Sequence, residues 1–163
     1  LEVSRTAHSI GIKTNASMLY GHIETIEERV DHLITLRNLQ DETGGIQTFI
    51  CFPFHPANTK LGKNIQRTSV WDDLKTMAIC RLMLDNIHNI KAYWVMLTLP
   101  IAQLALGFGA NDIDGTISEE KIMHDAGANS PKAMTRDNLI TLIKQTGRIP
   151  AECDCNFNII KTF

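Results

Sequence analysis

Two hydrophobic patterns alternate along the chain. Short β-rich runs are followed by segments in which apolar residues return at helical spacing, such as the stripe from Ile26 to Leu36. The β-rich runs cover 12–20, 46–54, 90–97 and 111–116. Because each strand precedes a helix, the pattern predicts four consecutive βα units with parallel strands and right-handed crossovers.

Capping residues mark where several of the helices should begin. Thr25 and Glu28 have the capping-box spacing. Ser69 precedes a helix expected over 70–86, and Thr135 precedes a last helix that runs to about 145. Pro100 suits the first turn of a helix between the third and fourth strands. Further helices are expected over about 1–10 and 118–126.

The fold class that follows is α/β. Four βα units are half of an eight-stranded barrel, and we treat 1–163 as a single unit of this kind. The main alternative is a flavodoxin-like open sheet. No phosphate-binding Gly-x-Gly-x-x-Gly follows a predicted strand. The chain begins without methionine, in what reads as the middle of a helix, so we expect it to be part of a longer protein.

The composition of the chain argues against several classes of function. The formal net charge is −2 with no long basic run, so binding to nucleic acid is not indicated. No apolar run reaches the ~18 residues of a membrane span, and no signal peptide is recognisable, so we expect a cytoplasmic protein. Cys51 and Cys80 lie in apolar segments, whereas Cys153 and Cys155 form a Cys-x-Cys pair without further ligands, so no metal site is predicted.

Polar and aromatic residues gather where the predicted strands end. Parallel α/β proteins bind ligands at the carboxyl ends of their strands. Those ends carry Gly21, His22 and Glu24, then His55, then Tyr93, then Asn111 and Thr116. Each also has a structural interpretation: Glu24 could favour the positive end of the following helix, and His22 could be a hydrogen-bonded turn residue.

Two aspartates near the fourth strand complete this set. We expect Asp112 and Asp114 to diverge, so that at most one of them faces the barrel axis. That aspartate would contact a ribose hydroxyl or orient a donor. Residue types alone indicate an α/β enzyme of undefined chemistry.

Several longer stretches resemble one enzyme family. They are GIKTNASMLYGHIET, RVDHLITLRNLQDETGGIQTFI, FHPANTKL, RLMLDNIHNIKAYWVML and FGANDIDGTISEEKIMHDAGA. Together they resemble the C-terminal half of the aminofutalosine synthases, radical S-adenosylmethionine (SAM) enzymes of the futalosine route to menaquinone. The dehypoxanthine futalosine cyclases and the deazaflavin synthase subunits look similar in the same places.

The resemblance implies a fold, an activity and a set of site residues. The family folds as a (β/α)8 barrel whose N-terminal half holds a [4Fe–4S] cluster. Its transferase reaction adds the 5′-deoxyadenosyl radical from SAM to 3-[(1-carboxyvinyl)oxy]benzoate, and rearrangement with loss of carbon dioxide gives aminofutalosine. YGHIET looks like the SAM-binding turn, which assigns Gly21, His22 and Glu24 to SAM. The aromatic substrate would contact donors at the strand ends, for which the candidates are His55, Tyr93, Asn111 and Thr116.

The sequence departs from the family in one respect. The cluster-binding Cys-x-x-x-Cys-x-x-Cys motif does not occur in it. We therefore expect the cluster ligands, and the N-terminal half-barrel as a partner, to come from outside this sequence, and the chain alone to be inactive. The alternatives are a sister radical SAM enzyme, or an inactive half-barrel module that self-associates through its exposed edges.

Overall fold

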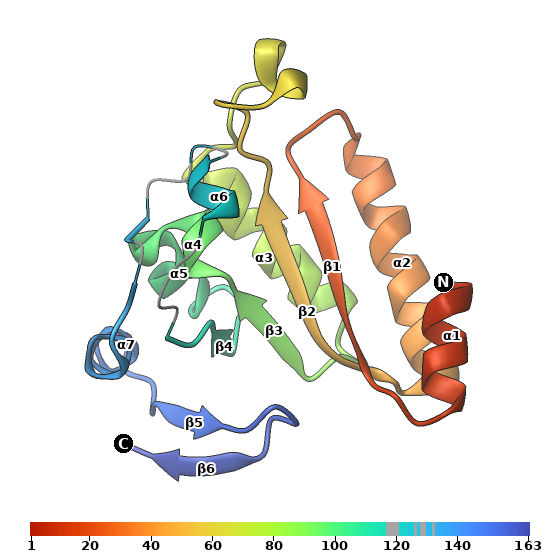
Figure 1. Cartoon of the computed structure of the whole chain (residues 1–163). Coiled ribbons are helices and arrows are strands. Elements are labelled where there is room, and N and C mark those ends of the chain that lie inside the picture. The colour runs from red at the N-terminus through yellow and green to blue at the C-terminus, as the bar shows by residue number, and fades with distance from the viewer. Residues whose placement is uncertain (117–120, 126, 128–129, 132) are drawn as a thin grey trace.

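A four-stranded parallel sheet organises the molecule. The computed structural model describes residues 1–116, 121–125, 127, 130–131 and 133–163 (Figure 1). The strands are β1 (Thr14–Tyr20), β2 (Ile46–Pro53), β3 (Asn89–Ala92) and β4 (Asp112–Ile113). They pair in the order β1-β2-β3-β4, and all three pairings are parallel. The predicted βα architecture is confirmed, and it fits the C-terminal part of a radical SAM barrel.

The first five helices along the chain contact the sheet, and those that lie between two strands connect them. The helices are α1 (Glu2–Ser9), α2 (Ile26–Thr43), α3 (Val70–Met83), α4 (Trp94–Leu97), α5 (Leu99–Ala105), α6 (Ile122–Asp125) and α7 (Arg136–Lys144), with a 3₁₀ turn η1 (Lys60–Asn64). The predicted caps are confirmed: Thr25 and Ser69 each form a capping box, and the side chain of Thr135 accepts the amide of Asn138. Within the part of the chain that the structure describes, no helix has the length and hydrophobicity to cross a membrane.

The third predicted strand is too long. β3 ends at Ala92, and residues 94–97 form the single helical turn α4. The reason is burial, because all four side chains of α4 are buried. A strand would direct alternate side chains to the opposite face of the sheet, whereas a helical turn turns all four into the core. Thr98, with φ of 80°, then redirects the chain into α5.

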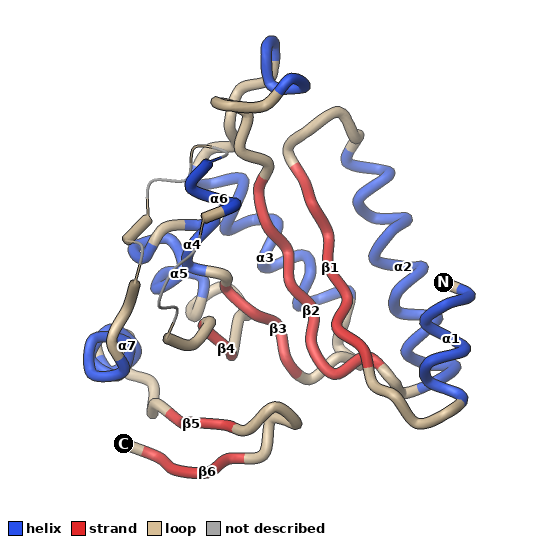
Figure 2. Tube along the Cα trace, in the orientation of Figure 1, coloured by secondary structure: helices blue, strands red, loops and turns tan. Residues whose placement is uncertain are grey.

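The other differences lie towards the C-terminus. β4 contains two residues rather than the predicted 111–116. The helix expected over 118–126 lies partly outside the described residues; its described part is α6. The last segment, for which we predicted no element, is an antiparallel hairpin of β5 (Ala151–Cys153) and β6 (Ile159–Thr162). Figure 2 shows this hairpin apart from the parallel strands.

The two faces of the parallel sheet differ in exposure. The covered face is the one against α2 and α3, where Tyr20 reaches Asp73 of α3. Most of its strand residues are at most 5% exposed: Met18, Tyr20, Phe49, Cys51, Ile90 and Ala92. The open face is the opposite one, and most of its strand residues are exposed or half-buried: Ser17, Leu19, Ile50, Phe52, Lys91 and Asp112. The register places these residues in neighbouring positions across the sheet.

One arginine organises the amino edge of the sheet, where β3 and β4 begin. Arg81, in the last turn of α3, donates to the carbonyl oxygens of Gly109 (2.7 Å), Ile87 (3.1 Å) and His88 (3.2 Å) and to Asn111 Oδ1 (2.8 Å). Asn111 Oδ1 also accepts the amide of Ile90 (2.8 Å). Arg81 therefore joins the loop before β3 to the loop before β4.

Candidate functional site

The turn that follows β1 is closed by a carboxylate. Glu24 Oε1 accepts the amide of Gly21 (2.6 Å), and Oε2 accepts the amide of His22 (2.9 Å). Arg29 Nε donates to Oε1 as well (2.7 Å). Burial alone would raise the pKa of the Glu24 carboxyl, but these amide donors and the Arg29 charge outweigh it, so the pKa is lowered. Glu24 is thus an ionised carboxylate that orders the predicted SAM-binding turn.

Gly21 has a structural reason to be glycine. Its φ is +78°, which residues with a side chain rarely adopt. A Cβ at this position would lie 2.4 Å from Cγ2 of Thr68, in the segment before α3. The turn can therefore pack against that segment only because Gly21 carries no side chain.

His22 offers an unused polar atom beside this turn. Its ring lies edge-on to that of Phe54, with 4.5 Å between the ring centroids. His22 Nε2 is screened from solvent and has no hydrogen-bond partner among the described residues. A buried ring nitrogen without a partner is uncommon in folded proteins and marks a place where a ligand group can bind.

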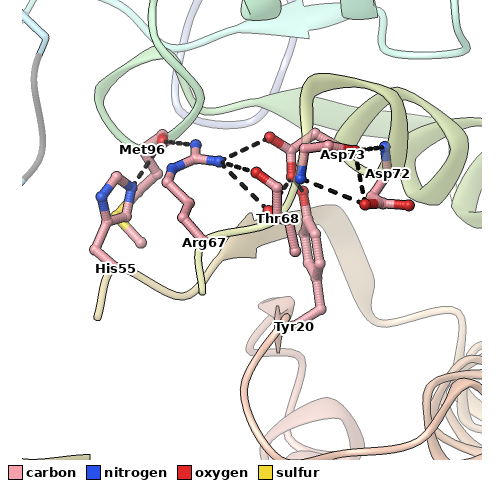
Figure 3. Close-up of polar contacts among 8 residues, drawn as sticks. Tyr20, His55, Arg67, Thr68, Asp72, Asp73 and Met96 are labelled. Carbon is pink, nitrogen blue, oxygen red and sulfur yellow. Dashed lines mark hydrogen bonds and ion pairs between the residues drawn. The ribbon is translucent and has the colours of Figure 1, made fainter. Parts of the chain in front are cut away.

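A buried aspartate ties the end of β1 to α3 and the preceding loop (Figure 3). Asp73 Oδ1 accepts the hydroxyls of Tyr20 (2.8 Å) and Thr68 (2.6 Å). Its other oxygen, Oδ2, accepts Nη1 of Arg67 (3.0 Å). Burial, and the nearby negative charge of Asp73, raise the pKa of the Tyr20 hydroxyl, which therefore stays protonated and donates.

The loop that carries Arg67 also lies beside His55, whose tautomer follows from the hydrogen bonds made to Met96. Arg67 Nη2 donates to the carbonyl of Met96 (3.0 Å), and His55 Nε2 bonds the same oxygen (2.9 Å). Since a carbonyl only accepts, Nε2 carries the hydrogen. Burial lowers the pKa of His55, so the ring is neutral at pH 7 and its Nδ1 is an acceptor. His55 thus presents an acceptor, not the donor that we expected.

A charged cluster lies on the open face. Lys91 Nζ contacts Asp114 Oδ1 (2.9 Å) and Asp112 Oδ2 (3.4 Å). The expectation that the two aspartates diverge was wrong, because residues two apart on a strand share a face. Burial alone would lower the pKa of Lys91, but the two carboxylates outweigh it and raise the pKa. Burial raises the pKa of the Asp112 carboxyl despite Lys91.

The remaining predicted residues fall in different places. Tyr93 follows β3 at the carboxyl edge, and its ring lies 6.4 Å from that of Phe52. Thr116 is exposed, three residues beyond β4. Asn111 lies at the amino edge with its side-chain oxygen occupied by Arg81 and Ile90, so its prediction as a residue of the carboxyl end was wrong.

The sequence analysis missed three charged residues of the site. Arg67 ends the long polar loop at 55–68 but was not singled out. Asp73 gives no local signal, because its role depends on contacts with Tyr20 and Arg67. Lys91 could have been found, since a lysine inside an otherwise apolar β-rich run is unusual and needs a partner when half-buried.

The residues present do not fit an iron–sulfur cluster. Cys51 and Cys80 are buried, whereas Cys153 and Cys155 are exposed on the C-terminal hairpin. Among the described residues no group of three or more His, Cys, Asp or Glu side chains is placed to hold a metal ion. A cluster needs at least three such ligands, so no step of its chemistry is assigned to this chain.

The fold is that of a parallel α/β protein, with a candidate ligand site at the carboxyl edge of its strands. Residues 43–161 match the family described as the CofH/MqnC C-terminal region. The chain belongs to this family. The resemblance to radical SAM enzymes is thereby confirmed.

Curated relatives match nearly the whole chain. An aminodeoxyfutalosine synthase from Thermus thermophilus is 47% identical over 166 residues, covering 100% of this chain and 45% of the relative. A 5-amino-6-(D-ribitylamino)uracil–L-tyrosine 4-hydroxyphenyl transferase from Archaeoglobus fulgidus is 45% identical, covering 98% and 47%. An aminodeoxyfutalosine synthase from Streptomyces coelicolor is 40% identical, covering 99% and 44%. The chain spans about half the length of these relatives.

Proposed function

We propose that this chain forms the C-terminal half of an aminofutalosine synthase. The reaction would join the 5′-deoxyadenosyl group of SAM to 3-[(1-carboxyvinyl)oxy]benzoate in menaquinone biosynthesis. The observation that carries the proposal is the 47% identity to the Thermus synthase along the whole chain. SAM and a [4Fe–4S] cluster are the proposed cofactors. The cluster would be held by an N-terminal half-barrel, and its chemistry would be the reductive cleavage of SAM.

The turn after β1 is the proposed SAM contact. Gly21 provides a turn without a side chain, and Glu24 holds that turn through the two amides. His22 Nε2 is the unused atom and is proposed to bond the nucleoside directly. Glu24 therefore acts mainly as a positioning residue, and His22 as the contact.

The aromatic substrate is proposed to lie against the carboxyl edge of β2 and β3. Tyr93 and Phe52 supply an aromatic wall there. Arg67 supplies a partly exposed cation for a substrate carboxylate. His55 can contribute packing but no hydrogen bond, because its remaining ring nitrogen is an acceptor and this substrate has no donor. Thr116 remains a candidate contact at the rim. Asn111 is left out because it lies at the other edge.

A second candidate is a deazaflavin-type transferase. The Archaeoglobus relative, named for joining a ribitylaminouracil to tyrosine, is 45% identical over 98% of the chain. The two identities are too close to separate the substrates. Both candidates place the same chain in the same half of a radical SAM enzyme, so they predict the same SAM contact and differ in the second substrate.

A chimera would test the proposal. The part of the Thermus synthase that precedes the matched region would be joined to this chain, and its cluster reconstituted anaerobically. We expect SAM cleavage, and aminofutalosine when 3-[(1-carboxyvinyl)oxy]benzoate is supplied. His22→Ala should weaken SAM binding about tenfold, as for the loss of one hydrogen bond. His88→Ala, at an exposed histidine before β3, is the matched control.

Each outcome separates the alternatives. Turnover with 5-amino-6-(D-ribitylamino)uracil and tyrosine, but not with the benzoate, would favour the deazaflavin-type transferase. If the chimera binds its cluster but does not cleave SAM when either substrate is supplied, both proposed reactions are rejected. Equal SAM affinity in the His22→Ala and His88→Ala chimeras would remove His22 from the site.

A further inference from the structure

The proposed function leaves the charged cluster on the open face unexplained. Lys91, Asp112 and Asp114 have side chains that are 18%, 24% and 25% exposed, respectively. Lys91 and Asp112 are paired across β3 and β4, and Lys91 is paired with Ile50 of β2. The cluster therefore lies on the face that α2 and α3 leave uncovered, at its β3–β4 side, where β4 is the last of the four paired strands.

The cluster has unbalanced charge and unused acceptors. Lys91 is the one cation among the described residues that contacts either carboxylate, so the formal sum is −1. Asp112 Oδ2 is screened from solvent, and it faces Lys91 Nζ at 3.4 Å in an ion pair that does not meet the geometry of a hydrogen bond. Carboxylates held away from water need donors. Asp112 Oδ2 is therefore the one oxygen of the cluster that is shielded from water and lacks a well-aligned donor among the described residues.

Aromatic rings border the cluster. Phe52 lies two residues beyond Ile50, and Tyr93 two beyond Lys91, so both share the open face and form the next row towards the carboxyl edge. Their rings meet edge to face with centroids 6.4 Å apart. Both side chains are only partly buried. An apolar wall thus stands next to fixed donors and acceptors, the usual composition of a small-molecule site.

We propose that Lys91, Asp112 and Asp114 bind the vicinal hydroxyl groups of a ribose or ribityl chain. A hydroxyl both donates and accepts, so it can donate to an aspartate while accepting from Lys91. A carboxylate ligand would be repelled by the net negative charge, and an amine would compete with Lys91. Neutral hydroxyls supply the missing donors without either conflict. The source of the polyol rests on the proposed function. A ribityl substrate can bind here together with SAM at the turn after β1, whereas binding of the ribose of SAM here would replace the contact proposed for His22.

Binding measurements without turnover would test this site. The 163-residue chain and the chimera would each be titrated with adenosine, with 5-amino-6-(D-ribitylamino)uracil and with 2′,3′-dideoxyadenosine, and followed by NMR or calorimetry. We expect one of the two polyols to bind, and dideoxyadenosine to bind at least about tenfold more weakly than adenosine if the ribose is the ligand. Lys91→Met and Asp114→Asn should each weaken polyol binding about tenfold or more.

A matched control variant tests whether the effect is specific to the cluster, and further variants replace Lys91→Met if it does not fold. Asp85→Asn alters an aspartate that pairs with Arg37 on the surface, and should change affinity less than twofold. If Lys91→Met does not fold, Asp114→Asn and Lys91→Arg carry the test. The site is rejected if neither polyol binds the chain or the chimera, or if the variants bind as tightly as the unaltered chain. No probe requires a cluster or turnover, so a chimera that fails to cleave SAM would reject the proposed function alone.

Discussion

The covered and open faces of the sheet are made by the same strands and differ in almost every other respect. Phe49, on the covered face, is 0% exposed, whereas Leu19, on the open face, is 48% exposed. The covered face is apolar apart from the hydroxyl of Tyr20, which is bonded to Asp73. The open face combines aromatic, aliphatic and charged side chains. One face therefore stabilises the fold, and the other carries groups that stability does not require.

The comparison also separates two kinds of polar group. Asp73 receives three donors and is fully satisfied inside the protein. Asp112 is half-buried with one oxygen that accepts no hydrogen bond within the described chain. A satisfied buried carboxylate indicates structure, and an unsatisfied one indicates a missing ligand or partner. Matched substitutions on the two faces can show whether stability and binding are separated in this way.

The largest difference should come from a matched pair of phenylalanines on β2. Phe49→Ala would open a cavity in the core and should lower the free energy of unfolding by about 3–5 kcal/mol. Phe52→Ala removes the same atoms from a half-buried position and should cost less than about 2 kcal/mol. Urea unfolding of both variants measures the difference. Equal losses would show that the open face is packed like the core.

The next largest loss of stability is expected at Asp73, the buried carboxylate on the covered side of the sheet. Asp73→Asn would weaken the acceptors for Tyr20, Thr68 and Arg67, and should lower the free energy of unfolding by about 3 kcal/mol. Asp85→Asn, at a surface ion pair, should cost less than about 1 kcal/mol. The same urea titrations apply. A loss at Asp73 as small as that at Asp85 would mean that the network contributes little.

A smaller effect is expected at the turn that leaves β1. Gly21→Ala imposes a side chain at φ of +78° and places its Cβ against Thr68, which should cost about 2 kcal/mol. Gly44→Ala, at φ of +60° with open space around it, should cost about 1 kcal/mol. The difference between their unfolding free energies measures the contact with Thr68. Identical values would mean that Thr68 moves aside freely.

The smallest effect is a pH dependence at the same turn. Because the folded pKa of Glu24 is lowered, its ionised form stabilises the fold above the ordinary glutamate range. That contribution is lost as the pH falls through the folded pKa. Glu24→Gln should therefore show a shallower loss of stability between neutral and acidic pH than the unaltered chain. Thermal unfolding across this range, with exposed Glu27→Gln as the control, measures the slope. If the stabilities of the Glu24→Gln and Glu27→Gln variants fall in parallel with pH, Glu24 is not the source of the pH dependence.

Local signals predicted the elements that depend on local physics. The capping boxes at Thr25 and Ser69 act within four residues, and the structure contains both. The helical turn α4 was missed because its β-rich sequence is overruled by tertiary burial, which no local pattern reports. β4 was predicted too long for a related reason, since only two of its residues reach β3.

The site was predictable in part. The turn with Gly21, His22 and Glu24 is local, so its position at the end of β1 followed from the strand boundary. The contacts of Arg67 and Lys91 depend on how distant segments meet, and the sequence analysis missed both. The orientation of Asp112 and Asp114 should have been predictable, since the pleat places residues two apart on one face.

The hydrogen bonds of Arg81 at the amino edge bear on how sequences in the family can diverge. Two residue pairs join β4 to β3. Arg81 adds to this by holding the loop before β4 at the amino edge of the sheet. The position of Asp112 is thereby set in part by contacts at the amino edge, away from the turn after β1 and from Tyr93. Changes in the loops at the carboxyl edge would therefore leave the alignment of β3 and β4 in place.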